Sequence, residues 1–123
     1  MPGFETINQK ELSQLKKIFK DGKGVLFRSG FDKLRGKSFQ VNKFEKKFAK
    51  KFNSNYALAV SSGTAALRVA LASLEIKKND EVITQSFTFV ATVEAIIESG
   101  AKPICTEIDS TLNMCPEDLL KKI

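Results

Sequence analysis

Hydrophobic and polar positions follow two different periods along residues 41–123. Short apolar runs, which are typical of β-strands, occur at 56–61, 81–84 and 103–108. Apolar side chains at helical spacing occupy residues 64–74, residues 90–97 and the stretch after Pro116. Strands that alternate with helices in this way predict an α/β fold with three mainly parallel strands.

A further helix is predicted near the start of the chain. Asn8–Glu11 matches a capping box, and apolar side chains at helical spacing follow it until Gly22. Residues 22–40 are rich in turn residues and predict an irregular connector. We therefore expect residues 1–123 to form a single domain, in which a helix and connector (1–40) precede an α/β core (41–123).

The helix predicted from Val41 carries phenylalanines at i, i+4 and i+8, namely Phe44, Phe48 and Phe52, and lysines flank them. One interpretation is a core-facing aromatic stripe with a solvated lysine face. The other is a helix that binds nucleic acid, which the net charge of +6 would favour. Aromatic rings that stack on bases must be free of the core, so the spacing favours the first interpretation.

The amino-acid composition excludes some kinds of catalytic and metal site. The chain has no histidine, which excludes histidine-based acid–base catalysis within it, and its two cysteines do not have the spacing of a zinc site. Cys105 and Cys115 are expected to be free thiols, which favours the cytoplasm. The polar N-terminus lacks a signal-peptide core, and no apolar stretch is long enough to span a membrane.

Ser61–Thr64 joins the first predicted strand to the helix at 64–74. A serine here can cap the helix, which requires no ligand. Alternatively, the free N–H groups of the helix, with Gly63 and the Thr64 hydroxyl, can cradle an anion such as a phosphate. The four residues alone leave both interpretations open. Neither a GxGxxG loop nor a P-loop spacing is present.

Three stretches carry a family resemblance: YALAVSSGTAALRVALASL, DEVITQSFTFVATVEAIIESGAKPICTEID and NMCPEDL. Together they closely resemble the DegT/StrS family of pyridoxal-phosphate (PLP) sugar aminotransferases. The resemblance implies part of a three-layer PLP-transferase large domain. It also implies a cofactor site in which Ser62, Gly63 and Thr64 bind the phosphate and Phe89 stacks on the pyridine ring.

The resemblance covers only the N-terminal third of such an enzyme. The Schiff-base lysine and the aspartate that faces the pyridine nitrogen lie in later motifs of the family, so no catalytic residue is predicted here and the chain alone is expected to be inactive. A full-length enzyme would use a nucleotide-linked keto-sugar and an amino donor, and would form a homo-oligomer. The other hypotheses are a non-catalytic α/β domain for oligomerisation or binding, and a basic nucleic-acid-binding module.

The family sheet raises a further question about residues 56–61. The strands that would lie beside this segment, as the resemblance implies, are not in the chain. An unpaired strand exposes its N–H and C=O groups. We therefore expect the segment to pair either with the second strand or with another copy of the chain.

Overall fold

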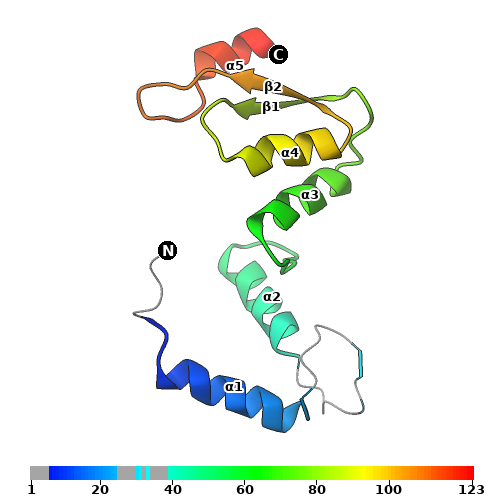
Figure 1. Ribbon diagram of the computed structural model, residues 1–123, viewed down its shortest axis with the longest axis vertical. Helices are drawn as coiled ribbons and strands as arrows, with labels where there is room; N and C mark the ends of the chain where they lie inside the picture. The colour runs from blue at the N-terminus through cyan, green and yellow to red at the C-terminus, as the bar shows by residue number, and fades with distance from the viewer. Residues whose placement is uncertain (1–5, 25–29, 32, 34–38) are drawn as a thin grey trace. The chain divides into compact units, whose positions relative to one another are not determined.

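The computed structural model describes residues 6–24, 30–31, 33 and 39–123. It comprises two compact units, residues 1–59 and 60–123 (Figure 1). The expected connector lies largely outside the described residues. The expectation of a single domain stays a prediction, because it concerns how the two units fold together.

In the first unit, helix α1 spans Gln9–Asp21 and begins at the predicted capping box. The Asn8 side chain accepts a hydrogen bond from the Lys10 N–H at 2.9 Å, and the Glu11 carboxylate accepts one from the Asn8 N–H at 2.8 Å. The helix ends where the Gly22 N–H donates to the Ile18 carbonyl at 2.8 Å. Both predicted ends are confirmed.

Helix α2 spans Gln40–Lys51, but the prediction of a buried phenylalanine stripe is wrong. Phe44, Phe48 and Phe52 are 57%, 46% and 62% exposed, whereas Glu45 and Ala49 are the buried residues of the helix. The following segment covers the Glu45 side of α2, since the Ala59 N–H donates to Glu45 Oε1 at 2.9 Å. The phenylalanine rings contact one another instead, with centroids 5.7 and 4.5 Å apart.

The prediction of a first strand at 56–61 is also wrong. Residues 56–60 have no strand assignment, and residue 61 begins the bend before the next helix. Among the described residues the sheet has two strands, β1 (Glu81–Gln85) and β2 (Lys102–Thr106). A strand is defined by its ladder, and in the part of the chain that the structure describes, residues 56–60 have no neighbouring strand with which to form one.

The second unit is built around a parallel β–α–β arrangement, which confirms the α/β class with two strands rather than three. Glu81 pairs with Lys102 and Gln85 with Thr106, so the strands are in register along their length. Helix α4 (Val90–Glu98) connects them, and α3 (Gly63–Ser73) packs on α4. Helix α5 (Pro116–Lys122) lies beside β2 (Figure 1).

Small side chains let α4 lie close to the strands. Ala91, Ala95 and Ile96 of this helix are buried. Thr106 on β2 is also buried, and its hydroxyl donates to the Thr84 carbonyl of β1 at 3.4 Å, which satisfies the polar group inside the core. Gly100, with φ +88°, closes α4 in the left-handed region that favours glycine. The strands and α3 are thereby held in fixed relation to α4.

Candidate functional site

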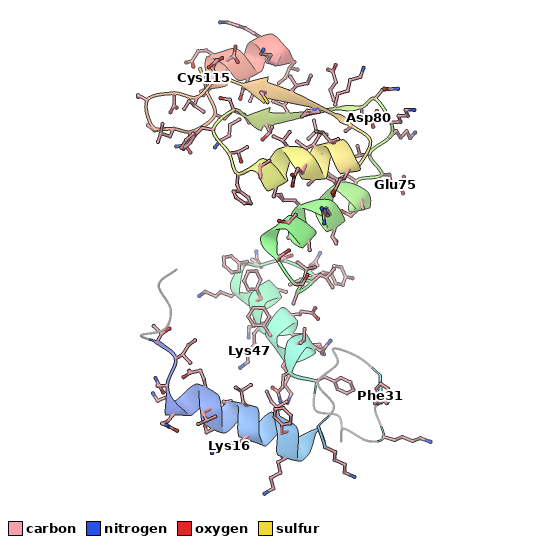
Figure 2. All side chains as sticks on the ribbon, in the orientation of Figure 1. Lys16, Phe31, Lys47, Glu75, Asp80 and Cys115 are labelled. Carbon is pink, nitrogen blue, oxygen red and sulfur yellow. The ribbon has the colours of Figure 1, made fainter. Side chains whose placement is uncertain are left out.

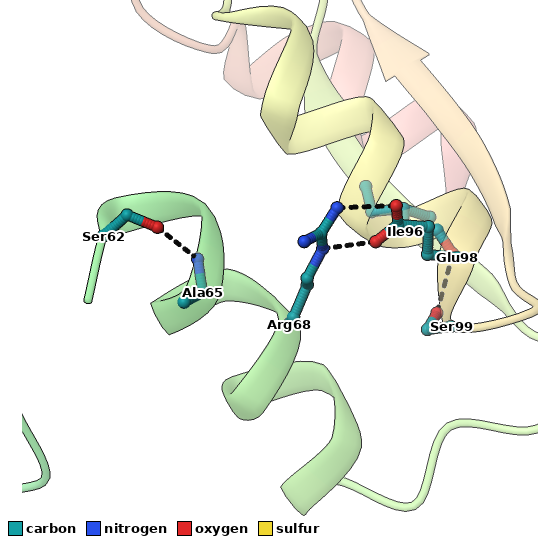
Figure 3. A network of polar contacts seen from close by, with 6 residues as sticks. All are labelled: Ser62, Ala65, Arg68, Ile96, Glu98 and Ser99. Atoms are coloured by element: carbon teal, nitrogen blue, oxygen red, sulfur yellow. Dashed lines mark hydrogen bonds and ion pairs between the residues drawn. The ribbon is translucent and has the colours of Figure 1, made fainter. Parts of the chain in front are cut away.

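Ser62 is the N-cap of α3. Its backbone is extended (φ −160°, ψ 166°), and its side-chain oxygen accepts a hydrogen bond from the Ala65 N–H at 3.1 Å (Figure 3). Its carbonyl accepts the first helical hydrogen bond, from the Ala66 N–H at 3.0 Å. The capping interpretation of this turn is therefore correct for the Ser62 side chain.

Gly63 and Thr64 begin the helix beside this cap. Within the described part of the chain, neither of their N–H groups has an acceptor, as expected for the first turn of a helix. A Cβ placed on Gly63 would meet no atom within 4 Å, so the space above its backbone is open. Two N–H donors and the positive end of the helix dipole therefore lie at an open turn, which also contains the half-buried Thr64. Capping by Ser62 and binding of an anion are compatible.

Phe89 is the N-cap of α4, and its side chain is 75% exposed. The loop that leads to it is held by the ends of both strands. The Ser86 N–H donates to the Thr106 carbonyl at 2.9 Å, and the Gln85 side-chain amide donates to the Phe87 carbonyl at 2.7 Å. The backbone of the loop is thus held by hydrogen bonds, and its aromatic side chain is exposed to solvent.

A pair of threonine hydroxyls, Thr88 and Thr92, lies 3.0 Å apart across the start of α4. No motif in the sequence pointed to Gln85 or Thr92, although both form hydrogen bonds with the loop that carries Phe89. A polar residue at the end of a predicted strand, directly before an aromatic loop, was the available signal for Gln85.

The fold places the predicted site residues at one end of the second unit. In Figure 1 both strands end at the left, and α3 and α4 both begin at the left. The carboxyl ends of strands and the N-termini of helices form the edge at which α/β sheets bind ligands. Among the described residues, however, no hydrogen bond or ring contact joins Phe89 to Ser62, Gly63 or Thr64.

The polar contact between the two helices lies farther along α3. The Arg68 guanidinium donates to Glu98 Oε1 at 2.6 Å and forms an ion pair with the same carboxylate (Figure 3). Both side chains are about half exposed and border an open cavity of about 410 Å³ whose apolar wall includes Leu71 and Ala95. Because solvent screens exposed ion pairs, this contact adds little to the stability of the unit.

Other chemistry is sparse in the described part of the chain. Cys105 and Cys115 are free thiols there, and Cys115 lies at the start of α5 (Figure 2). No group of three or more metal-ligating side chains occurs among the described residues. In the same residues, every helix is too short or too polar to cross a lipid bilayer.

Residues 25–123 match the DegT/DnrJ/EryC1/StrS aminotransferase family, so the chain belongs to this family. GDP-perosamine synthase of Vibrio cholerae is 41% identical over 96 residues, which are 77% of this chain and 26% of that protein. The chain therefore spans about a quarter of the length of this curated relative.

Solved structures of similar enzymes have the same fold. An aminotransferase from Psychrobacter cryohalolentis matches with a TM-score of 0.78 and 30% identity, over 98% of this chain and 28% of that chain. GDP-4-keto-6-deoxy-D-mannose-3-dehydratase of E. coli, with bound hydrated PLP, matches with a TM-score of 0.78 and 29% identity, over 96% of this chain and 29% of that chain. The expected partial PLP-transferase fold is confirmed.

Proposed function

We propose that residues 1–123 are the N-terminal portion of a PLP-dependent aminotransferase that acts on nucleotide-linked keto-sugars. Family membership supports the reaction class, and the likeness to a GDP-perosamine synthase supports the substrate class. The observation that carries the proposal is the open turn at Gly63 and Thr64, which offers unpaired N–H groups at the strand edge of an α/β unit.

The residues present fit the phosphate of PLP. The N–H groups of Gly63 and Thr64 and the Thr64 hydroxyl would bind it, and Ser62 would hold the turn through its cap. Phe89, exposed at the start of α4, would stack on the ring, a contact worth about 0.5–1.5 kcal/mol. When bound, PLP supplies an electron sink for chemistry at the carbon that bears the nitrogen.

The residues of this chain bind and orient the cofactor but do not attach it. The described lysines of α1 and α2 are exposed, and none of the chain's lysines lies in a motif that resembles the family's attachment lysine. A lysine that attacks a carbonyl must be activated by its surroundings. We therefore propose that residues 1–123 alone transfer no amino group, and that catalysis, the amino donor site and a homo-oligomeric assembly belong to the longer enzyme in the cytoplasm.

The relatives of this chain include enzymes of two reaction types, aminotransferases and a dehydratase. One structural relative is a 3-dehydratase, so a dehydratase is the second candidate within the PLP class. A non-catalytic α/β binding domain and a basic nucleic-acid-binding module are the alternatives outside it. The lysines of α2 support the nucleic-acid hypothesis, and its binding should weaken steeply with salt.

An amide-resolved NMR titration of the 123-residue chain tests the phosphate site. Inorganic phosphate and PLP should shift the amide signals of Gly63 and Thr64, because their N–H groups receive the anion. PLP should in addition shift the Phe89 signals. Pyridoxal, which has the ring and no phosphate, is the matched control and should leave Gly63 and Thr64 unchanged.

Two results would decide against the proposal. Phosphate-induced shifts confined to the lysine-rich helices, with none at Gly63 or Thr64, would indicate nonspecific anion binding. Equal shifts at Gly63 with pyridoxal and with PLP would show that the turn does not recognise the phosphate. Neither outcome depends on the oligomeric state of the chain.

A further inference from the structure

Residues 86–89, which we call the β1–α4 loop, join the end of β1 to the start of α4 (Figure 1). The loop contains no glycine or proline, the residues that usually set a tight turn. Its two aromatic side chains, Phe87 and Phe89, are 59% and 75% exposed, so burial of their rings does not fix the loop either. The conformation of the β1–α4 loop therefore depends on hydrogen bonds.

Backbone hydrogen bonds hold the two ends of the β1–α4 loop. At its start, the Ser86 N–H donates to the Thr106 carbonyl of β2 at 2.9 Å. At its end, the Thr92 N–H donates to the Phe89 carbonyl at 2.9 Å. Bonds between backbone groups form with almost any side chain, so these two bonds leave the path between the ends to other contacts.

The middle of the loop is held by a side chain. The Gln85 amide donates to the Phe87 carbonyl at 2.7 Å. In the part of the chain that the structure describes, no other side chain forms a hydrogen bond with the backbone of the loop. Gln85 is therefore the residue whose identity matters most for the path of the loop.

The sheet fixes the base of the Gln85 side chain. Gln85 is the last residue of β1, pairs with Thr106 of β2 and is half-buried. Because a peptide group is planar, a hydrogen bond to the Phe87 carbonyl fixes the plane that joins Phe87 to Thr88. The direction in which the chain approaches Phe89 is set by that plane.

We propose that Gln85 is a positioning residue for the cofactor ring, because its amide holds the β1–α4 loop in the conformation that presents Phe89. This role rests on the proposed function, in which Phe89 stacks on PLP. Gln85 acts through the loop and not by contact with the cofactor, since its amide is directed at the Phe87 carbonyl.

The expected size of the effect is that of one hydrogen bond. A single intramolecular hydrogen bond changes the ratio of the held loop to the open loop by roughly two- to tenfold. When only one conformer binds a ligand, the apparent affinity falls with the fraction of that conformer. PLP affinity should therefore fall by this factor when the donor is removed. Inorganic phosphate would bind at Gly63 and Thr64, so its affinity should stay the same.

Gln85→Met in the 123-residue chain tests this role, because methionine has nearly the same length and no donor. NMR measures the amide ¹⁵N relaxation of residues 87–89 without ligand, and then the affinities for PLP and inorganic phosphate. The variant should increase the ps–ns motion of residues 87–89, weaken PLP binding by roughly two- to tenfold and leave phosphate affinity unchanged. Gln14→Met, at an exposed position of α1, is the matched control and should change none of the three.

Gln85→Glu gives a second test, in which the hydrogen bond can be restored in the same molecule. At pH 7 the introduced carboxylate has no proton to donate and repels the Phe87 carbonyl, so the loop should be mobile. A protonated carboxyl donates its O–H, so the order of residues 87–89 should return as the pH falls through the carboxyl pKa, ordinarily about 4.3. In the unmodified chain, the order of these residues should not rise over the same range.

Four results would contradict the positioning role. If Gln85→Met bound PLP as tightly as the unmodified chain, the role would be wrong and the proposed function would stand. Weaker PLP binding with unchanged loop motion would mean that Gln85 contacts the cofactor directly. Equal losses of PLP and phosphate affinity would assign Gln85 to the stability of the whole unit. No response of Phe89 to PLP in the unmodified chain would overturn the stacking role and the positioning role together.

Discussion

At the scale of single residues, the turn before α3 divides two tasks among neighbours. Ser62 uses its side chain on the Ala65 N–H and is committed to the helix. Among the described residues the N–H groups of Gly63 and Thr64 have no acceptor, and a Cβ on Gly63 would meet no atom within 4 Å. The sequence predicted which four residues form the turn but not this division, which depends on the rotamer of one serine.

The variant Gly63→Ala should change phosphate affinity and the free energy of unfolding in different ways. Gly63 is not in the left-handed region and a Cβ there meets no atom, so alanine should leave the free energy of unfolding unchanged or raise it by about 0.4–1 kcal/mol. The methyl group would occupy the space that a phosphate approaches, so phosphate and PLP affinity should fall. Denaturant unfolding and the NMR titration measure the two effects.

Gly100→Ala is the control for that variant. Gly100 has φ +88°, which an L side chain rarely adopts, so alanine should cost about 1–2 kcal/mol of stability and leave phosphate affinity unchanged. If Gly63→Ala kept full phosphate affinity, the turn would not be the anion site.

The loop at Asp109–Thr111 should change its structure with pH, because its hydrogen bonds depend on the ionised Asp109 carboxylate. The Thr111 hydroxyl and the Thr111 N–H donate to the Asp109 carboxylate, and they lower its pKa below the ordinary value of 3.8. A carboxyl whose pKa is lowered on folding stabilises the fold above its unfolded pKa, and that contribution is lost as pH falls through the folded pKa. The Thr111 amide signal should therefore hold constant down to about pH 4 and change below it.

The carboxyl titration of Asp109, followed by NMR, provides the check. A midpoint at or above 3.8 would mean that the two Thr111 hydrogen bonds do not persist in solution.

At the scale of elements, the helices were predictable because their signals are local. The capping box at Asn8 and the proline at the start of α5 each depend on a few consecutive residues. The strand expected at 56–61 was not predictable in the same way, because a strand requires a neighbour and the neighbour is not in its own sequence. The phenylalanine stripe of α2 failed for the same reason, since a 3.6-residue period shows an apolar face but not what covers it.

The contact between α3 and α4 should depend on packing more than on charge. Arg68→Ala removes a half-exposed ion pair and should cost no more than about 1 kcal/mol. Ala95→Leu adds three carbons at a position that is only 1% exposed, and should cost about 1–3 kcal/mol through overpacking. Denaturant unfolding of both variants measures the two losses in the free energy of unfolding. A larger loss for Arg68→Ala than for Ala95→Leu would refute this ranking.

Helix α5 should gain from a better cap. Cys115 is its N-cap, but the thiol makes no capping hydrogen bond and donates instead to Glu117 at 3.2 Å. Cys115→Ser should stabilise the second unit by about 0.5–1 kcal/mol, because a serine oxygen accepts from the first-turn N–H groups. Thermal unfolding measures the gain, and Cys105→Ser is the control for loss of a thiol without a cap. Equal effects of the two variants would contradict the capping account.

At the scale of the whole molecule, the chain forms two compact units with different surface features. The second unit holds Ser62, Gly63, Thr64 and Phe89 at the edge where helices begin and strands end. The first unit holds α2, whose phenylalanine side chains are exposed. Family membership explains the fold of the chain, which spans about a quarter of the length of a curated relative.

The central claim is that this chain binds the cofactor's phosphate but does not attach the cofactor. Its most direct test is a titration with PLP, then borohydride reduction to fix any lysine linkage, then peptide mapping by mass spectrometry. We predict weak, salt-sensitive binding, with small amounts of adduct spread over several exposed lysines and no amino transfer. One dominant, stoichiometric lysine adduct, accompanied by amino transfer to a keto-sugar, would contradict the account.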